Sequence, residues 1–136
     1  MTVRAANPYV ILNGHADRAI AFYTTALEAQ TRALMRFGDN NPSCAEALKN
    51  NVMHCELRIG DASVMLSDGP GVGELPPSGI VQIALDLDDP EEAKKLFANL
   101  AERGAIVQEL FAAPWGALFG ALRDPFGVQW MFNAKL

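Results

Sequence analysis

The chain is short of the residues that usually announce a site: it has two cysteines and two histidines among 136 residues. It also lacks any apolar run near the roughly 20 residues that span a bilayer. Acidic residues outnumber basic ones by sixteen to eleven, and no basic stripe interrupts this net charge of −5. Nucleic-acid and anionic-membrane partners are therefore disfavoured. Without a signal-peptide layout or a CxxC pair, the chain is expected in the cytoplasm.

The two cysteines give little reason to expect thiol chemistry. Cys55 alternates with Met53 and Leu57 along an apolar strand pattern, which predicts a core position. The alternative is a catalytic thiolate. No histidine is obviously placed to activate one, so we expect Cys55 to be a small packing residue.

What the chain does have is regular periodicity. Apolar residues at three- and four-residue spacing predict an amphipathic helix within 14–29. A second helix is predicted within 89–104, with Asp89 as N-cap, Pro90 in its first turn and Gly104 past its end. Strands are predicted at 7–13, 31–37, 52–60, 62–68, 79–87, 105–111, 117–124 and 127–132. Asp124 and Gly127 are predicted to serve the last hairpin turn.

The order strand–helix–strand–strand–strand occurs twice, on either side of a Gly/Pro-rich stretch. We predict module 1 at about 1–68, a linker at about 69–78 and module 2 at about 79–136. The expected fold class is α+β, with two paired βαβββ modules forming a curved mixed sheet around a cleft.

Alternation along the strands assigns side chains to two faces of each sheet. The side facing the helix is predicted to hold Met53, Cys55, Leu57, Ile59, Val64 and Leu66 in module 1, and Val81, Ile83, Leu85 and Leu87 in module 2. The opposite side is predicted to hold His54, Glu56, Arg58, Ser63, Met65 and Ser67, and Gln82, Ala84, Asp86, Gln129 and Met131.

The trio His54, Glu56 and Arg58 is the one compact titratable cluster that the pattern predicts. Side chains at i and i+2 share a face about 7 Å apart, so the trio could clamp a polar ligand, supply a base through His54, or help to hold a metal. The simpler interpretation is a solvated sheet face with a Glu56–Arg58 salt bridge. Both interpretations stay open on the sequence.

Three stretches carry a resemblance to a known family: PYVILNGHADRAIAFYTTAL, MHCELRIGDASVMLSD and PWGALFGALRDPFGVQWMF. Together they resemble the PhnB-like branch of the vicinal oxygen chelate superfamily, which also holds glyoxalase I, bleomycin-resistance proteins and extradiol dioxygenases. The resemblance implies two βαβββ modules, a small-molecule ligand and a homodimer.

The resemblance also implies four metal-ligand positions, which map to Pro8, Met65, Gln82 and Met131. Imidazole and carboxylate are the ligands such metals prefer, and none stands there. A shift of two residues offers Val10, Ser67, Ala84, Gln129 or Asn133, again without histidine or carboxylate. We therefore expect no metal and no cofactor.

The predicted function is binding of an unidentified small molecule, without metal. The predicted ligand-binding residues are His54, Glu56, Arg58, Met65, Gln82, Trp115, Phe119 and Met131, with the two aromatics as apolar walls. The alternative is a lyase, isomerase or hydrolase acting through His54 and Glu56, with or without a divalent metal. A third possibility is an interaction protein whose dimer is the functional unit.

Overall fold

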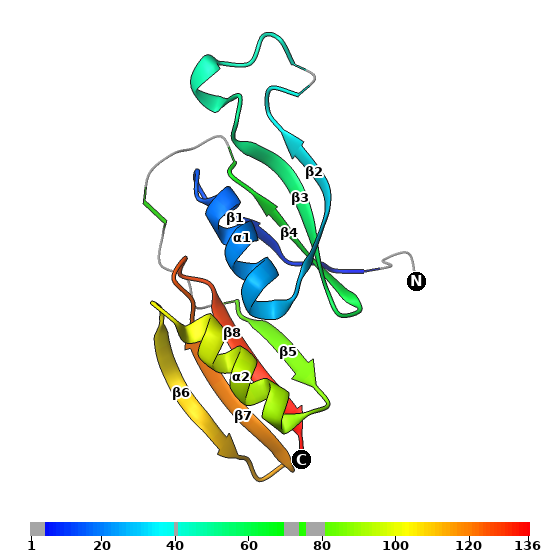
Figure 1. The fold of residues 1–136 in the computed structure, drawn as a ribbon, viewed down its shortest axis with the longest axis vertical. Coiled ribbons are helices and arrows are strands. Elements are labelled where there is room, and N and C mark those ends of the chain that lie inside the picture. The colour runs from blue at the N-terminus through cyan, green and yellow to red at the C-terminus, as the bar shows by residue number, and fades with distance from the viewer. Residues whose placement is uncertain (1–4, 40, 70–73, 76–80) are drawn as a thin grey trace. The chain divides into compact units, whose positions relative to one another are not determined.

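The structure is a computed structural model that describes residues 5–39, 41–69, 74–75 and 81–136. The chain divides into two units, Met1–Leu75 and Pro76–Leu136, and each builds one four-stranded sheet with one α-helix (Figure 1). Unit 1 contains β1 (Tyr9–Ile11), α1 (Ala16–Leu27), β2 (Gln30–Arg36), a short 3₁₀ helix (Glu46–Leu48), β3 (Val52–Ile59) and β4 (Ala62–Ser67). Unit 2 contains β5 (Ile83–Leu87), α2 (Pro90–Ala101), β6 (Ala105–Ala112), β7 (Ala117–Arg123) and β8 (Gln129–Lys135).

The two sheets have the same plan. Their strand orders are β1-β4-β3-β2 and β5-β8-β7-β6. In each, the first strand pairs in parallel with the last, and the other neighbours are antiparallel. The predicted α+β class and the twice-repeated strand–helix–strand–strand–strand order are therefore confirmed.

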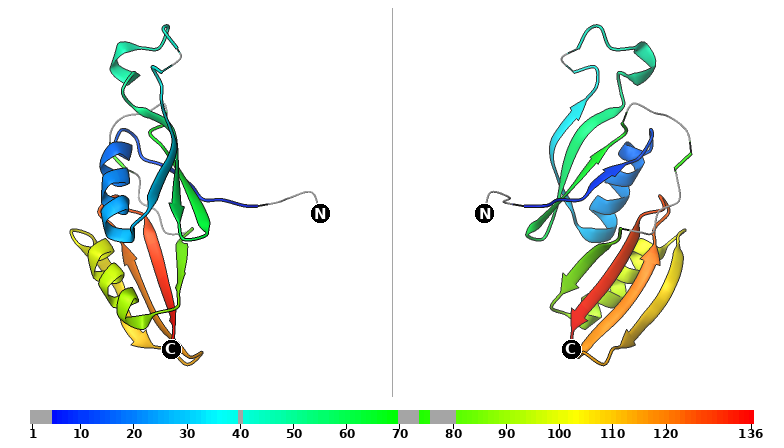
Figure 2. Two further views of the ribbon diagram at one scale, coloured as in Figure 1. Left: turned by 45° about the vertical axis from the view of Figure 1, so that its right-hand side comes forward. Right: turned by 180° about the vertical axis from the view of Figure 1, so that it is seen from behind.

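Each helix covers one side of its own sheet and leaves the other side free of helix (Figure 2). The periodicity explains this, because the apolar stripe of α1 includes Ala19 and Tyr23 and that of α2 includes Phe97 and Leu100, all of them buried. Residues buried from the strands include Cys55, Leu57, Val64, Leu66, Leu122, Trp130 and Phe132. Apolar burial of this kind is the main source of stability in each unit.

One predicted core residue, Met53, is on the outside. Its side chain is 39% exposed, whereas the neighbouring Val52 is fully buried. The β2–β3 pairing shifts register between Arg32 and Met35 and again before Arg36, so the alternation is broken at this end of β3. The assignment of Met53 to the helix side was therefore wrong, and Val52 fills that place.

The first strand of each unit starts later than expected. Strand β5 begins at Ile83, so Gln82 precedes it, and Val81 is 77% exposed instead of packing under the helix. Strand β1 spans only Tyr9–Ile11, although the Pro8 carbonyl still accepts a 3.0 Å hydrogen bond from Met65 N. Both differences move candidate ligand positions, as described below.

The capping of α2 is partly as predicted. Asp89 is the N-cap, and its carboxylate accepts a 3.0 Å hydrogen bond from Glu91 N. The residue with positive φ after the helix is Arg103 (φ 61°), not Gly104. Gly104 is required for another reason: a Cβ there would lie 2.1 Å from the Arg123 carbonyl oxygen, so only glycine lets the chain pass β7 this closely.

Candidate functional site

The helix-free side of the unit 1 sheet is lined mainly by polar side chains. Registers across the four strands place Tyr9 opposite Met65, Met65 opposite Glu56, and Glu56 opposite Arg32. Because directly paired residues share a face, these four side chains form one row across the sheet. We call this side the polar face, made of Tyr9, Gln30, Arg32, His54, Glu56, Arg58, Ser63 and Met65.

His54 has a partner that the sequence analysis did not anticipate. The Tyr9 hydroxyl lies 2.9 Å from His54 Nδ1, and the two rings are tilted with centroids 5.7 Å apart. Glu56, the predicted neighbour of His54, is instead hydrogen-bonded to Ser63. The alternation of Tyr9 with Ile11 could have placed Tyr9 on the same side of the sheet as His54. A strand of three residues is too short for its pattern to show which side each residue faces.

A serine hydroxyl links Glu56 to Arg58. Ser63 Oγ donates a hydrogen bond to Glu56 Oε2 and accepts a 3.0 Å hydrogen bond from Arg58 Nη1. The predicted direct Glu56–Arg58 salt bridge is therefore wrong: among the ion pairs of the described ranges, these two side chains do not meet. All three residues are partly buried, which strengthens the polar contacts between them.

The helix-free side of the unit 2 sheet has a different character. Phe119 makes edge-on contacts with Phe111 at 6.3 Å and with Trp115 at 5.4 Å between ring centroids. Trp115 Nε1 donates a 2.9 Å hydrogen bond to Asn133 Oδ1, which fixes the indole although it is 60% exposed. We call this side the aromatic face, made of Asp86, Phe111, Trp115, Phe119, Met131 and Asn133.

The structure thus brings the predicted Trp115 and Phe119 together. Met131 lies in the next row, paired with Ala84 and Ala121. Gln82 lies outside the strand, so its place opposite Met131 is taken by Ala84. Phe111 is not among the residues predicted from the sequence for this site, and Asn133 is predicted only as a shifted ligand position on the Met131 side, not as the partner of Trp115.

The strand registers allow the metal-ligand positions to be corrected. Tyr9, not Pro8, faces Met65, and Val10 pairs with Leu66 on the helix side. The paired positions are thus Tyr9 with Met65 in unit 1 and Ala84 with Met131 in unit 2. The next positions along the same sides are Ile11, Ser67, Asp86 and Asn133.

These donors do not fit a hard divalent cation. A phenol, thioethers and a methyl group offer no imidazole or carboxylate, and Asp86 is the one carboxylate in the second set. Over the part of the chain that the structure describes, no three His, Cys, Asp or Glu side chains gather closely enough to hold a metal ion.

Cys55 is fully buried on the helix side, as its alternation predicted. Burial raises the pKa of its thiol, and the nearby Glu56 charge adds to the effect. Both causes disfavour the thiolate, which is the nucleophilic form. Cys55 is therefore a packing residue and not a candidate nucleophile.

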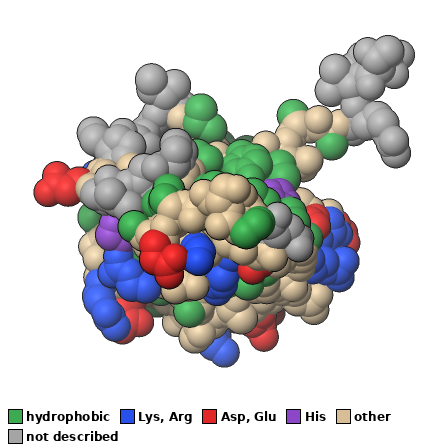
Figure 3. Space-filling model, turned by 90° about the horizontal axis from the view of Figure 1, so that it is seen from above, with side chains coloured by type: hydrophobic (Ala, Val, Ile, Leu, Met, Phe, Trp, Pro, Cys, Tyr) green, Lys and Arg blue, Asp and Glu red, His purple; other side chains and the backbone are tan. Residues whose placement is uncertain are grey.

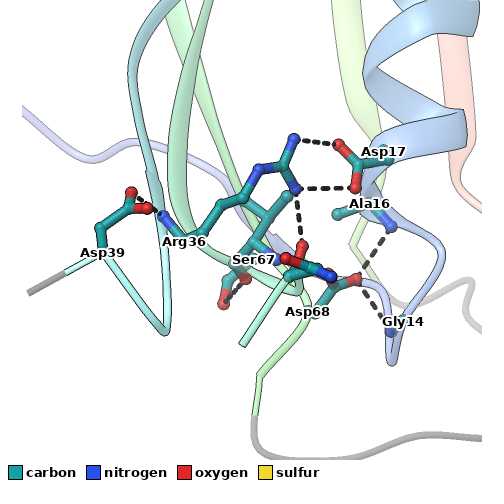
Figure 4. A network of polar contacts seen from close by, with 9 residues as sticks. Gly14, Ala16, Asp17, Arg36, Asp39, Ser67 and Asp68 are labelled. Carbon is teal, nitrogen blue, oxygen red and sulfur yellow. Dashed lines mark hydrogen bonds and ion pairs between the residues drawn. The ribbon is translucent and has the colours of Figure 1, made fainter. Parts of the chain in front are cut away.

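A buried carboxylate, Asp68, links the start of α1 to the start of β3 within unit 1 (Figure 4). Asp68 Oδ1 accepts hydrogen bonds from Gly14 N at 2.8 Å and Ala16 N at 2.9 Å, at the start of α1. Asp68 Oδ2 accepts from Val52 N at 2.7 Å, at the start of β3. This residue is structural: it satisfies backbone N–H groups that would otherwise be buried without a partner.

An exposed ion pair lies next to this carboxylate. Arg36 bonds to both Asp17 oxygens, at 2.8 and 2.9 Å, and to the Asn50 carbonyl at 2.7 Å (Figure 4). The hydrogen bond and charge of Asp17 raise the pKa of Arg36. The bidentate geometry joins α1 to the end of β2.

None of the helices in the described ranges is long and apolar enough to cross a membrane. On the side of the molecule shown in Figure 3, Lys and Arg side chains lie among Asp and Glu side chains instead of forming one basic patch.

Comparison with known proteins gives three findings. The model of the Glyoxalase/Bleomycin resistance protein/Dioxygenase superfamily matches residues 5–132. Protein YjdN of Escherichia coli (strain K12) is 31% identical over 137 residues, covering 93% of this chain and 92% of that protein. The crystal structure of protein PA1353 from Pseudomonas aeruginosa has a TM-score of 0.85 and 34% identity, covering 98% of both chains.

A fourth similarity concerns the fold alone. A putative 3-demethylubiquinone-9 3-methyltransferase, PhnB protein, from Bacillus cereus has a TM-score of 0.78 at 23% identity. It covers 96% of this chain and 99% of that one. The likenesses extend over both units, as the motifs quoted from the sequence do.

Proposed function

The chain belongs to the glyoxalase/bleomycin resistance protein/dioxygenase superfamily, and on that premise we propose that it is a small-molecule-binding protein that works without a divalent metal. The polar face and the aromatic face are the proposed binding surfaces. The donor chemistry supports the metal-independent part, because the corrected ligand positions of each sheet carry phenol, thioether and methyl groups instead of imidazole or carboxylate.

The aromatic face is the observation that carries this proposal. Phe119 contacts Phe111 on one side and Trp115 on the other, both edge-on, and Asn133 holds the indole in place by its side chain. Ligand sites typically combine apolar and aromatic walls with a few fixed polar groups, and this surface has both. An exposed indole fixed by a hydrogen bond has little conformational entropy left to lose when a ligand stacks on it.

The alternative of catalysis draws on one contact. Tyr9 and His54 form a hydroxyl–imidazole pair at 2.9 Å, a geometry suited to proton transfer. The predicted partner Glu56 is engaged by Ser63 instead of orienting His54. His54 and Glu56, the pair on which the catalytic alternative depends, are therefore not hydrogen-bonded to each other, and this favours binding over catalysis.

We expect an uncharged aromatic probe, N-phenyl-1-naphthylamine, to bind the aromatic face and to take up excitation energy from Trp115. The protein has two tryptophans, and Trp130 is 1% exposed in the core, so a surface ligand acts on Trp115 first. Trp115→Ala should weaken probe binding roughly tenfold, because it removes one stacking partner and frees Asn133. Fluorescence titration measures both effects.

The matched control is Val81→Ala, which removes an exposed apolar side chain that precedes β5 and lies outside the aromatic face. It should leave probe affinity unchanged. Titrations with and without EDTA should agree. Equal affinities for Trp115→Ala and wild type would contradict the proposed surface, and loss of binding with EDTA would contradict metal independence.

We also propose that the chain forms a homodimer. Strand β6 is the edge of its sheet, and it exposes Ile106 and Val107. An edge with exposed apolar side chains favours pairing with another chain. Size-exclusion chromatography with light scattering at micromolar concentration should give twice the chain mass of 14.7 kDa, and a clean monomer would contradict the proposal.

A further inference from the structure

We propose that the polar face contains an anion-binding site, formed by Arg32 and Arg58, that takes a carboxylate or phosphate group of the ligand. This inference rests on the proposed function, because it names the chemical class of the molecule bound. It is carried by the register of two strands, by the hydrogen bonding of the two guanidinium groups and by the local charge.

The register places both arginines on the same side of the sheet. Arg32 is directly paired with Glu56, and Arg58 with Gln30. Arg32 and Arg58 are therefore diagonal neighbours, whose Cα atoms are typically about 7–8 Å apart on one face of an antiparallel pair. Two long guanidinium side chains at that spacing can reach the same anion.

Most donors of the two guanidinium groups are uncommitted. Arg58 Nη1 donates to Ser63 Oγ, and Arg32 Nη2 makes a long 3.4 Å contact with Gln30 Oε1. A guanidinium has five N–H donors, so several remain on each side chain. The three ion pairs found within the described residues involve other basic residues, and neither arginine has a carboxylate within 4.0 Å there.

The arginines with free donors stand in an acidic protein. The chain carries a net charge of −5, but the polar face has two positive charges against the single negative charge of Glu56 when His54 is neutral. The neighbouring strands β1 and β4 add uncharged side chains to this face, such as Tyr9 and Met65. A local reversal of the overall charge selects anions over cations.

Ser63 explains how Glu56 fits into an anion site. Its hydroxyl donates to Glu56 and accepts from Arg58, so the carboxylate is held away from direct contact with the guanidinium. The planar fork of Arg58 therefore keeps donors for a bidentate carboxylate or phosphate. Glu56 moderates the affinity by repelling the incoming anion, so its removal should tighten binding.

The test uses inorganic phosphate and acetate as probes, each titrated into the full chain at low ionic strength and followed by calorimetry. Arg58→Met and Arg32→Met should each weaken binding about tenfold. Arg58→Lys keeps the charge but loses the fork, and should weaken binding by less. Glu56→Gln should strengthen it about threefold or more.

Arg123→Met is the matched control, because it removes an exposed arginine from the other sheet. It should bind both anions as wild type does. The anion that binds more tightly identifies the group recognised. Unchanged affinity in Arg58→Met and Arg32→Met, or weaker binding in Glu56→Gln, would overturn the inference.

The variants also separate this inference from the proposed function. Arg58→Met and Arg32→Met should bind N-phenyl-1-naphthylamine with wild-type affinity, since that probe is uncharged and is assigned to the aromatic face. Normal probe binding with no phosphate or acetate binding by wild type would overturn the anion site alone. Loss of probe binding in Trp115→Ala with intact anion binding would support both surfaces.

Discussion

Asp68→Ala is expected to lower the free energy of unfolding by about 4 kcal/mol, because hydrogen bonds to a charged group contribute roughly 1.5–3 kcal/mol each and buried donors are costly to leave unsatisfied. The carboxylate is 1% exposed and accepts from the backbone N–H groups of Gly14, Ala16 and Val52. Alanine leaves these groups inside unit 1 without an acceptor. Urea denaturation followed by circular dichroism measures the loss.

The control is Asp39→Ala, which also removes a carboxylate bonded to a backbone N–H. Asp39 Oδ2 accepts from Arg36 N at 2.7 Å, but the residue is exposed, and water can replace it (Figure 4). We expect a loss of about 0.5–1 kcal/mol there. If Asp68→Ala cost no more than Asp39→Ala, the interpretation of Asp68 as a buried structural acceptor would be wrong.

Asp124→Ala is expected to destabilise unit 2 by about 3 kcal/mol, for the same physical reason applied to a hairpin turn. The carboxylate is 2% exposed. It accepts from Phe126 N at 2.9 Å and Val128 N at 3.1 Å, and from the buried indole of Trp130 at 2.8 Å. Asp124 is predicted from the sequence to serve the turn alone, and the contact with the Trp130 indole adds an anchor in the core.

The fluorescence of Trp130 can measure this loss of stability. In a Trp115→Phe background, unfolding in urea followed by tryptophan emission observes Trp130 alone. Asp61→Ala is the matched control, because Asp61 lies in the corresponding β3–β4 turn of unit 1 and is exposed. Similar midpoints for Asp124→Ala and Asp61→Ala would contradict the anchoring role of Asp124.

The elements of the fold were predictable because periodicity reports burial directly. Alternation in 52–60 assigned Cys55 and Leu57 to the core, and three- and four-residue spacing located both helices. The likeness to the glyoxalase/bleomycin resistance/dioxygenase superfamily is also confirmed by the family match. Long, strongly periodic segments leave little choice between secondary structures.

In short or irregular strands, the sequence did not predict which residues face which side of the sheet. Strand β1 has three residues, so its own pattern could not decide between Pro8 and Tyr9; the parallel pairing of Tyr9 with Met65 decides it. At Met53 the register shift against β2 reverses the local pattern. Both are properties of a partner strand distant in the sequence.

The polar contacts were hidden for a related reason. Asp68 is predicted as the last residue of the strand 62–68, yet its hydrogen-bond partners at Gly14 and Ala16 lie more than fifty residues earlier in the chain. The Ser63 link between Glu56 and Arg58 depends on the register of the β3–β4 hairpin. Side-chain chemistry was visible in the sequence, but proximity across strands was not.

The shared strand order of the two sheets has an evolutionary consequence. In the central strands β3, β4, β7 and β8, one set of alternating side chains is buried beneath the helix, and the other set lies on the helix-free side. One sheet has filled its free positions with charged and hydroxyl groups such as Arg58 and Ser63, the other with rings such as Phe119. The buried side chains and the side chains of the helix-free side are separate residues. Substitutions on the helix-free side can therefore change what either sheet binds without disturbing the buried core.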